Sequence, residues 1–329
     1  MGIFAGFIIA CLTIIPLGKE SSIQYYFAAA LIIFFLGLKD DILVLTPLKK
    51  IIGQVIAASI IIAKGDIVIH SMYGFLGVYE LPQLISLSVT LLTIIVIINS
   101  FNLIDGIDGL AAGLGIFTTL TFGIYFYMAG QIEMAAMALI MTGSLAAFLI
   151  FNRAPARIFM GDTGSLLVGL MNAILVIKFI NIAASPAAVI PIESSAAIGV
   201  SILMIPLFDT LRVFAIRIFN RRSPFSPDRN HIHHILLDKG LAPQTVSLLL
   251  VAVNVLFLVF TYNLRHLNIN LLIPILVATA FGGFSILYFY KRRHTLMVVA
   301  GKGDGGVLQL TKSKPIVPLT PAPKTAEQN

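Results

Sequence analysis

The stretch NSFNLIDGIDGL, residues 99–110, decides how this chain is organised, because it joins two long apolar segments. Residues 84–98 before it and 110–128 after it approach the ~20 apolar residues that cross a bilayer as a helix. Helix is the expected conformation of both segments, since a lipid-exposed backbone must satisfy its own hydrogen bonds. The stretch itself carries two Asp-Gly pairs and two Asn, which predict a polar turn between two membrane spans.

The composition extends this interpretation to the whole chain. Of its 329 residues, 58% are hydrophobic and 11% are charged, and the mean hydropathy is +0.98. Ordinary soluble domains have about 25% charged residues. We therefore predict an all-α, polytopic transmembrane helical bundle of about ten spans, with its active-site loops in the cytoplasm. The expected spans are residues 2–17, 23–38, 48–63, 84–98, 110–128, 133–151, 166–180, 196–208, 244–263 and 270–290.

The basic residues predict the orientation of these spans. If the polar motifs are placed on one side, only Lys19, Lys64, Lys178 and Arg265 of the 22 basic residues fall on the other. The positive-inside rule then puts every motif on the cytoplasmic face. The net charge of +7 is scattered over short loops, which favours lipid headgroups over nucleic acid as its partner.

Two further features bound the organisation. The single cysteine, Cys11, excludes a disulfide framework and a CxxC metal site. After a transmembrane domain at residues 1–294, the chain lacks large apolar runs and ends in PIVPLTPAPKTAEQN, which predicts a flexible cytoplasmic tail at residues 295–329.

Five aspartates lie where apolar segments end, and they are the main functional signal: Asp40, Asp41, Asp105, Asp108 and Asp162. A carboxylate beside hydrocarbon is costly and is a functional-site hypothesis by default. A set of oxygen ligands at membrane ends suggests a hard cation such as Mg²⁺, held against phosphate. The adjacent pair Asp40 and Asp41 should repel, so that one pKa rises unless the two share a cation. The alternative for this pair is a solvated helix end.

Two more motifs point to phosphate. NRAPARIFMGDTGS, residues 152–165, places Asp162 between glycines just before a helix expected from Leu166, which suits a metal–phosphate contact or, alternatively, an N-cap. His231, His233 and His234 lie in the longest cytoplasmic loop, which is rich in arginine. Adjacent histidines hardly give the geometry of a zinc site, so we favour phosphate binding over a structural or a metal role. Asp209 and Arg212, three residues apart, predict a structural ion pair on one helix face.

Taken together and in order, KDD, FNLIDGIDGLAAG, MGDTGS and HIHH resemble the polyprenyl-phosphate N-acetylhexosamine-1-phosphate transferases. The resemblance covers residues 1 to about 290 and looks more like the branch that uses UDP-N-acetylglucosamine. The sister branch, phospho-N-acetylmuramoyl-pentapeptide transferase, usually has three consecutive histidines where this chain has His-Ile-His-His. Family members usually have one more span, with a basic loop, before the position of Gly2, so we expect the family's first helix to be missing here.

The resemblance implies the reaction and its partners. A sugar 1-phosphate passes from a UDP-N-acetylhexosamine to a polyprenyl phosphate such as undecaprenyl phosphate, and UMP is released. The enzyme would be a multi-pass protein of the bacterial inner membrane with a cytoplasmic active site. It would have no nucleic-acid partner and could form a homodimer. The alternatives are the muramoyl-pentapeptide transferase and an ion-coupled transporter, although transporters tend to place carboxylates near the bilayer midplane.

By the same resemblance, Asn102 and Asp162 would hold Mg²⁺, or Mn²⁺ in its place, on the diphosphate. Asp40 and Asp41 would act on the lipid phosphate, and Asp105 near the metal, as the catalytic residues. The monoester nucleophile has a second pKa of about 6 and is mostly a dianion at neutral pH, which weakens the need for a strong general base. Positioning and electrostatics would then supply most of the rate.

The remaining matched positions would bind substrate. Asp108 falls at the position that recognises uracil, Asn152 near the diphosphate and Lys50 in the lipid-phosphate pocket. The phosphate-contacting loop would be formed by His231, His233 and His234.

Overall fold

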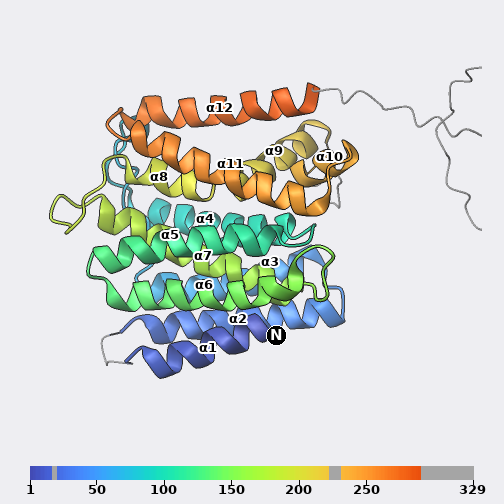
Figure 1. Ribbon diagram of the computed structural model, residues 1–329. Coiled ribbons are helices and arrows are strands. Elements are labelled where there is room, and N and C mark those ends of the chain that lie inside the picture. The colour runs from blue at the N-terminus through green and yellow to red at the C-terminus, as the bar shows by residue number, and fades with distance from the viewer. Residues whose placement is uncertain (17–20, 222–230, 290–329) are drawn as a thin grey trace, which may run out of the picture. The chain divides into compact units, whose positions relative to one another are not determined.

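The computed structural model describes residues 1–16, 21–221 and 231–289, which form one helical unit (Figure 1). The described residues contain no strand beyond an isolated bridge between Ser71 and Glu80, so the all-α class is confirmed. The predicted tail at residues 295–329 lies outside the described residues. The helices are α1 (Gly2–Ile14), α2 (Ile23–Ile42), α3 (Pro47–Ala63), η1 (Phe75–Gly77), α4 (Gln83–Ile104), α5 (Leu110–Met128), α6 (Ile132–Asn152), α7 (Gly161–Ala183), α8 (Ser195–Ile202), α9 (Met204–Phe219), α10 (Ile232–Asp238), α11 (Pro243–Asn263) and α12 (Ile269–Phe289).

The number of helices that can span a membrane alone is smaller than predicted. Within the described ranges, seven helices are long and apolar enough, and the bent pair of α8 and α9 makes an eighth. α1 has 13 residues and α3 has 17. At 1.5 Å per residue these lengths are about 20 and 26 Å, short of the ~30 Å hydrocarbon core. The polytopic architecture is confirmed. The predicted number of about ten spans is larger because it included α1 and α3, which are shorter than a full span.

Three helices are longer than their apolar stretches, and each extension carries a motif. α2 continues to Ile42, α4 continues to Ile104, and α7 begins at Gly161 instead of Leu166. The aspartate pair therefore lies in the last turn of α2, and the GDTGS motif forms the first turn of α7. The apolar stretches end where polar residues begin, but the helices continue. Side chains from other parts of the chain, such as Asp41 at the start of α7, bond to the polar groups of these extensions.

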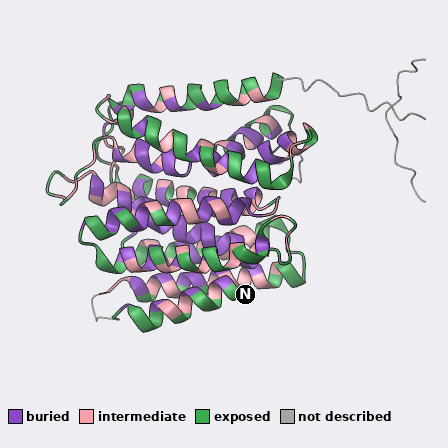
Figure 2. Ribbon diagram, in the orientation of Figure 1, coloured by how far each residue is buried: buried purple, intermediate pink, exposed green. Residues whose placement is uncertain are grey.

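α7 is the centre of the bundle and packs against α2, α4 and α5. Most of its side chains are buried, whereas outer helices such as α12 present large apolar side chains outward, as expected for a lipid-facing surface (Figure 2). Two glycines permit the closest helix approaches. A Cβ on Gly37 of α2 would lie 2.6 Å from Thr163 Cα, and a Cβ on Gly169 of α7 would lie 2.6 Å from Ile98 Cα. Small residues allow such backbone contact between membrane helices.

The predicted span at residues 196–208 is broken into α8 and α9, which meet at an angle of 80°. Pro206 has no N–H to donate to the carbonyl of Ile202, four residues earlier. The buried side chain of Asn254 on α11 supports the break. Its Nδ2 donates to Ile202 O at 2.7 Å, and its Oδ1 accepts from Ile205 N at 2.8 Å. α11 thereby holds the direction of α9.

Replacing Asn254 with Leu is expected to lower the melting temperature in detergent, followed by circular dichroism. The change leaves two buried backbone groups without a partner, each at a cost of about 1–3 kcal/mol. Asn263→Leu is the matched control, because Asn263 lies on the same helix, is exposed and, among the described residues, bonds only to Val259 O within α11. Equal losses in the two variants would contradict the bracing role of Asn254.

Candidate functional site

The four motifs of the sequence meet at one end of the bundle, on the right in Figure 1. This end gathers the C-terminal ends of α2, α4, α6 and α9, together with the starts of α5, α7 and α10. Their convergence on one face is as predicted, while the compartment that this face meets stays a prediction.

Lys50 of α3 lies between carboxylates from two other helices. Its Nζ is 2.7 Å from Asp40 Oδ2 and is also paired with Asp162 Oδ2. Asn102 of α4 donates from Nδ2 to Asp162 Oδ1 at 2.9 Å and to Ser165 Oγ at 3.0 Å. Four predicted site residues from four helices thus form one cluster, in which the ammonium of Lys50 pairs with two carboxylates. Sequence reasoning did not single out Ser165, the remaining member.

Asp41 faces a different partner, the first turn of α7. Its Oδ1 accepts from Asp162 N at 2.8 Å, and its Oδ2 accepts from Thr163 N at 3.1 Å and from the Thr163 hydroxyl. A carboxylate there is stabilised by unpaired amides and by the helix dipole. The adjacent pair is therefore divided: Asp40 shares the Lys50 ammonium with Asp162, whereas Asp41 accepts from the first turn of α7.

Asp105 follows the last residue of α4 and lies outside the membrane-spanning segments. Burial, together with the negative charges of Asp162 and Asp41, raises the pKa of Asp105 to about 8, against the opposing effect of the Gly161 N–H. A carboxyl group whose pKa is raised by burial and by nearby carboxylates is typical of functional sites. Asp105 thus lies near enough to Asp162 and Asp41 to respond to their charges, while its predicted role near the metal stays a prediction.

The residues of this cluster fit a hard divalent cation. No three His, Cys, Asp or Glu residues within the described ranges are arranged to hold a metal by themselves. Mg²⁺, however, commonly takes one or two protein carboxylates and completes its shell with water and substrate phosphate. Asp162 offers such a carboxylate, and Asn102 would offer Oδ1 once its amide turns that atom toward the ion.

Asp108 and Asn152 join the α4–α5 turn to the α6–α7 loop. Asp108 Oδ2 accepts from Ala156 N at 3.0 Å. Asn152 accepts from Gly109 N and donates to Ile158 O, each at 2.9 Å. These contacts position the two loops that frame Asp162, while the predicted contacts of Asp108 and Asn152 with substrate stay predictions.

The histidine motif packs against the same turn. His233 is 1% exposed, and its ring nitrogens have no hydrogen-bond partner among the described residues. A Cβ on Gly106 would lie 2.3 Å from His233 Nε2, so only glycine leaves room for the ring there. The ring of His231 is parallel to that of His233, with centroids 5.7 Å apart. The His-Ile-His-His motif therefore reaches the Asp-Gly turn that lies far from it in the sequence.

The predicted ion pair between Asp209 and Arg212 is present, at 2.8 Å. Sequence reasoning missed a second partner of Asp209, the ring of His231, whose Nδ1 is 2.8 Å from Asp209 Oδ2. No spacing rule links these residues, which are 22 positions apart and meet only in the folded structure.

His233 makes the fold sensitive to acid. Burial, followed by the charges of His234 and His231, lowers its pKa to about 4, although Asp209 acts in the opposite direction. Between this value and the ordinary value of 6.5, the unfolded chain binds a proton that the folded chain does not. This part of the free energy of unfolding is therefore complete above pH 6.5 and falls as the pH drops toward 4, by up to about 1.4 kcal/mol per pH unit.

We expect His233→Gln to flatten the fall in unfolding free energy between pH 6.5 and 4, measured by denaturant titration in detergent. His266→Gln is the matched control, because the His266 side chain is 62% exposed and pairs with Glu193 at 2.9 Å. An unchanged slope in His233→Gln would contradict the assignment.

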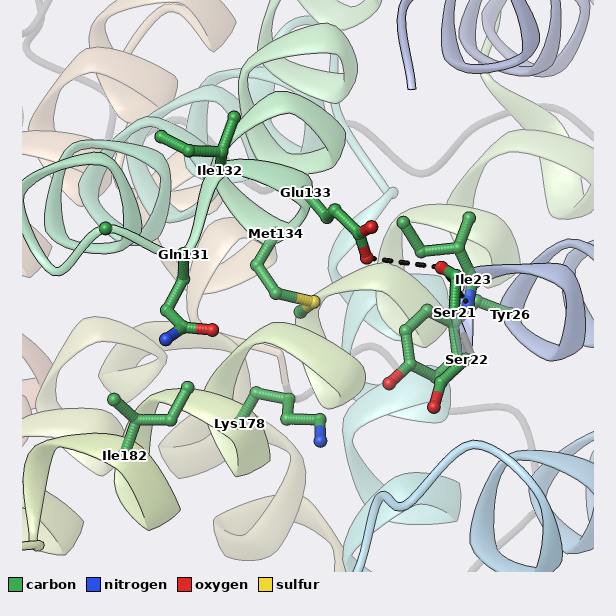
Figure 3. Close-up of a pocket in the computed structure, with 11 residues that line it drawn as sticks. Ser21, Ser22, Ile23, Tyr26, Gln131, Ile132, Glu133, Met134, Lys178 and Ile182 are labelled. Carbon is green, nitrogen blue, oxygen red and sulfur yellow. Dashed lines mark hydrogen bonds between the residues drawn. The ribbon is translucent and has the colours of Figure 1, made fainter. Parts of the chain in front are cut away.

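The opposite end of the bundle carries none of the predicted site residues. There, the starts of α2 and α6 and the last turns of α7 line a cavity of about 430 Å³ (Figure 3). Ser21 donates to Glu133 at 3.2 Å at its edge, and Lys178, which also lines it, pairs with Asp66 at 2.8 Å. The motif chemistry is thus confined to the end that holds Asp162.

Comparison with known proteins agrees with this arrangement. The sequence profile of glycosyl transferase family 4 matches residues 23–180. The chain is 34% identical to the decaprenyl-phosphate N-acetylglucosaminephosphotransferase of Mycobacterium leprae, over 70% of this chain and 62% of the relative. It is 33% identical to the probable undecaprenyl-phosphate N-acetylglucosaminyl 1-phosphate transferase of Bacillus subtilis, over 73% of this chain and 65% of the relative.

A third relative, the undecaprenyl-phosphate alpha-N-acetylglucosaminyl 1-phosphate transferase of Yersinia pestis, is 29% identical over 69% of this chain and 62% of the relative. The chain thus spans less than two thirds of the length of these relatives. The matched profile contains the two aspartate motifs and the GDTGS motif that converge in the structure. The resemblance is confirmed: residues 23–180 of this membrane protein match glycosyl transferase family 4, and the three relatives are named as polyprenyl-phosphate N-acetylglucosamine phosphotransferases.

Proposed function

We propose that this protein transfers N-acetylglucosamine 1-phosphate from UDP-N-acetylglucosamine to undecaprenyl phosphate, forming undecaprenyl diphosphate-N-acetylglucosamine and UMP. The reaction would take place at the cytoplasmic face of the bacterial inner membrane and would open a cell-wall or surface-polysaccharide pathway. The observation that carries this proposal is the cluster of Asp40, Lys50, Asn102 and Asp162 at the ends of membrane helices. It brings a cationic side chain together with an amide and carboxylates that would hold Mg²⁺.

The chemistry joins two anions. An oxygen of the lipid phosphate attacks the phosphorus that carries the sugar, a new P–O bond forms, and the bond from that phosphorus to the oxygen of UMP breaks. The attacking oxygen supplies the electron pair of the new bond, and the oxygen of UMP leaves with the pair of the broken bond, so no oxidant is needed. Like charges must be neutralised for in-line approach, which is what Mg²⁺ supplies when bound.

The residues of the cluster would divide this work. Asp162 and Asn102 would hold Mg²⁺, and the ammonium of Lys50 would meet the lipid phosphate beside Asp40. Asp105 lies near enough to Asp162 and Asp41 to respond to their charges, and would accompany them in positioning the diphosphate. Asp41 holds the first turn of α7, and with it Asp162, in place.

The test uses membranes that contain the protein, UDP-N-acetylglucosamine labelled in the sugar, and undecaprenyl phosphate. We expect UMP release and a labelled lipid product that both require the lipid acceptor and disappear with a chelator of divalent cations. Mn²⁺ in place of Mg²⁺ tests the ion, and decaprenyl phosphate tests the length of the lipid.

Other outcomes would reassign the function. Turnover of UDP-N-acetylmuramoyl-pentapeptide instead of UDP-N-acetylglucosamine would identify the sister activity. Ion-dependent solute uptake without UMP release would favour a transporter.

A further inference from the structure

We propose that Asp209 is a positioning residue for the histidine motif, and that it acts by fixing the ring of His231. The two residues come from different elements, since Asp209 lies on α9 and His231 is the N-cap residue of α10. Both are buried, with exposures of 2% and 4%. The inference deepens the proposed transferase function, on which its kinetic part rests.

The two oxygens of Asp209 have different tasks. Oδ1 accepts from the guanidinium of Arg212 at 2.8 Å and from the backbone N of Ile232 at 2.9 Å. The second of these bonds satisfies an amide in the first turn of α10, which has no partner within its own helix. Oδ2 is 2.8 Å from His231 Nδ1. An ionised carboxylate only accepts hydrogen bonds, so Nδ1 must carry the proton and Nε2 is the nitrogen left for a ligand.

This contact extends to the turn between α4 and α5 through parallel rings. The planes of His231 and His233 are within 10° of parallel. His233 in turn lies against Gly106, in the turn that carries Asp105 and Asp108. Asp209 on α9 therefore fixes the first ring of this pair, and the second ring packs against the turn that carries Asp105 and Asp108.

The anchor is itself held from two sides. Arg212 stacks over the Phe284 ring of α12, with its guanidinium carbon 4.2 Å from the ring centroid. Asn254 of α11 holds the start of α9. Because α11 and α12 both hold α9, Asp209 can orient His231 without touching the substrate.

Asp209→Asn tests this role directly, because the two donors to Oδ1 determine the orientation of the new amide group. Arg212 and Ile232 N require an acceptor, so the amide oxygen must take the place of Oδ1 and the NH₂ must take the place of Oδ2. The NH₂ then donates to His231 Nδ1, and the ring proton moves to Nε2. The variant keeps the shape of the side chain and reverses the tautomer of His231.

The kinetic test uses the full chain in membranes. We expect Asp209→Asn to lower kcat/KM for the UDP-sugar by about 10- to 100-fold, the range found when the partner that orients a metal-ligating histidine is removed. The loss should fall mainly on the KM for the UDP-sugar, with the KM for the lipid acceptor unchanged. The double variant Asp209→Asn/His231→Gln should be no slower than His231→Gln alone. Losses that multiply would mean that Asp209 acts independently of His231, and would overturn the proposal.

A spectroscopic test is independent of transferase activity. In protein labelled with ¹⁵N-histidine, the His231 signals are identified by their loss in His231→Gln. In the wild type, Nδ1 should give a protonated, pyrrole-type signal, and Asp209→Asn should exchange the types of the two nitrogens. Asp66→Asn is the matched control, because that carboxylate is 75% exposed and pairs with Lys178 at the opposite end.

The two tests separate the failures. Wild-type protein without UMP release, but with the expected ¹⁵N pattern, would reject the proposed transferase function and keep the positioning role. An unprotonated Nδ1 of His231 in the wild type would overturn the positioning role, whether or not Asp209→Asn folds.

Discussion

Asp162→Asn is expected to abolish transferase activity, with a loss of at least about 10³-fold, or ~4 kcal/mol of transition-state stabilisation. Asp162 joins Lys50 from α3 to Asn102 from α4. A neutral amide would remove the anionic ligand proposed for Mg²⁺ and leave Lys50 with Asp40 as its carboxylate partner in the cluster. The measurement is the initial rate of labelled lipid product at saturating Mg²⁺.

Asp41→Asn is the contrasting variant at the same end of the bundle. Asp41 caps α7, and a lipid phosphate with a second pKa of about 6 is already ionised at neutral pH, so a measurable rate should remain. Mg²⁺-dependent thermal stabilisation of the two variants gives a readout apart from activity, and it should be lost in Asp162→Asn. A wild-type rate from Asp162→Asn would overturn the metal assignment.

Gly37→Ala is expected to lower activity by about 10²-fold, which is the cost of a displacement of about 1 Å at reacting groups. The added Cβ would lie 2.6 Å from Thr163 Cα and 2.7 Å from the carbonyl carbon and oxygen of Asp162. These are backbone atoms that cannot turn aside, so α2 must move away from α7. That movement would carry Asp40 and Asp41 away from Asp162, and overpacking should also destabilise the fold by about 1–3 kcal/mol.

Gly143→Ala is the matched control for Gly37→Ala. Gly143 lies on α6, another long apolar helix, and a Cβ there would meet no atom within 4 Å. Alanine is the better helix former by about 1 kcal/mol, so this variant should keep its activity and melt no lower than the wild type. Product formation and melting temperature in detergent check both variants. Normal activity in Gly37→Ala would show that the approach of α2 to α7 does not set the site.

The sequence predicted the helices well where lipid dictates them, and less well where polar residues continue them. α5 has the predicted bounds, whereas α2, α4 and α7 run on into their motifs. The reason is that backbone groups at these ends are satisfied by distant side chains, such as Asp41 for the first turn of α7. A hydropathy pattern contains no information about such partners.

The sequence by itself determined that this is a helical membrane protein, because a backbone in lipid must bond to itself and long apolar runs leave no other conformation. The order and the residues of its motifs also predicted the family resemblance that the comparison confirmed. Only the tertiary structure decided which charges meet: Lys50 joins Asp40 to Asp162, Asp41 turns away to cap α7, and Asp209 holds His231. Ion pairs and hydrogen bonds act over about 3 Å, so they depend on how the helices pack and not on separation along the chain.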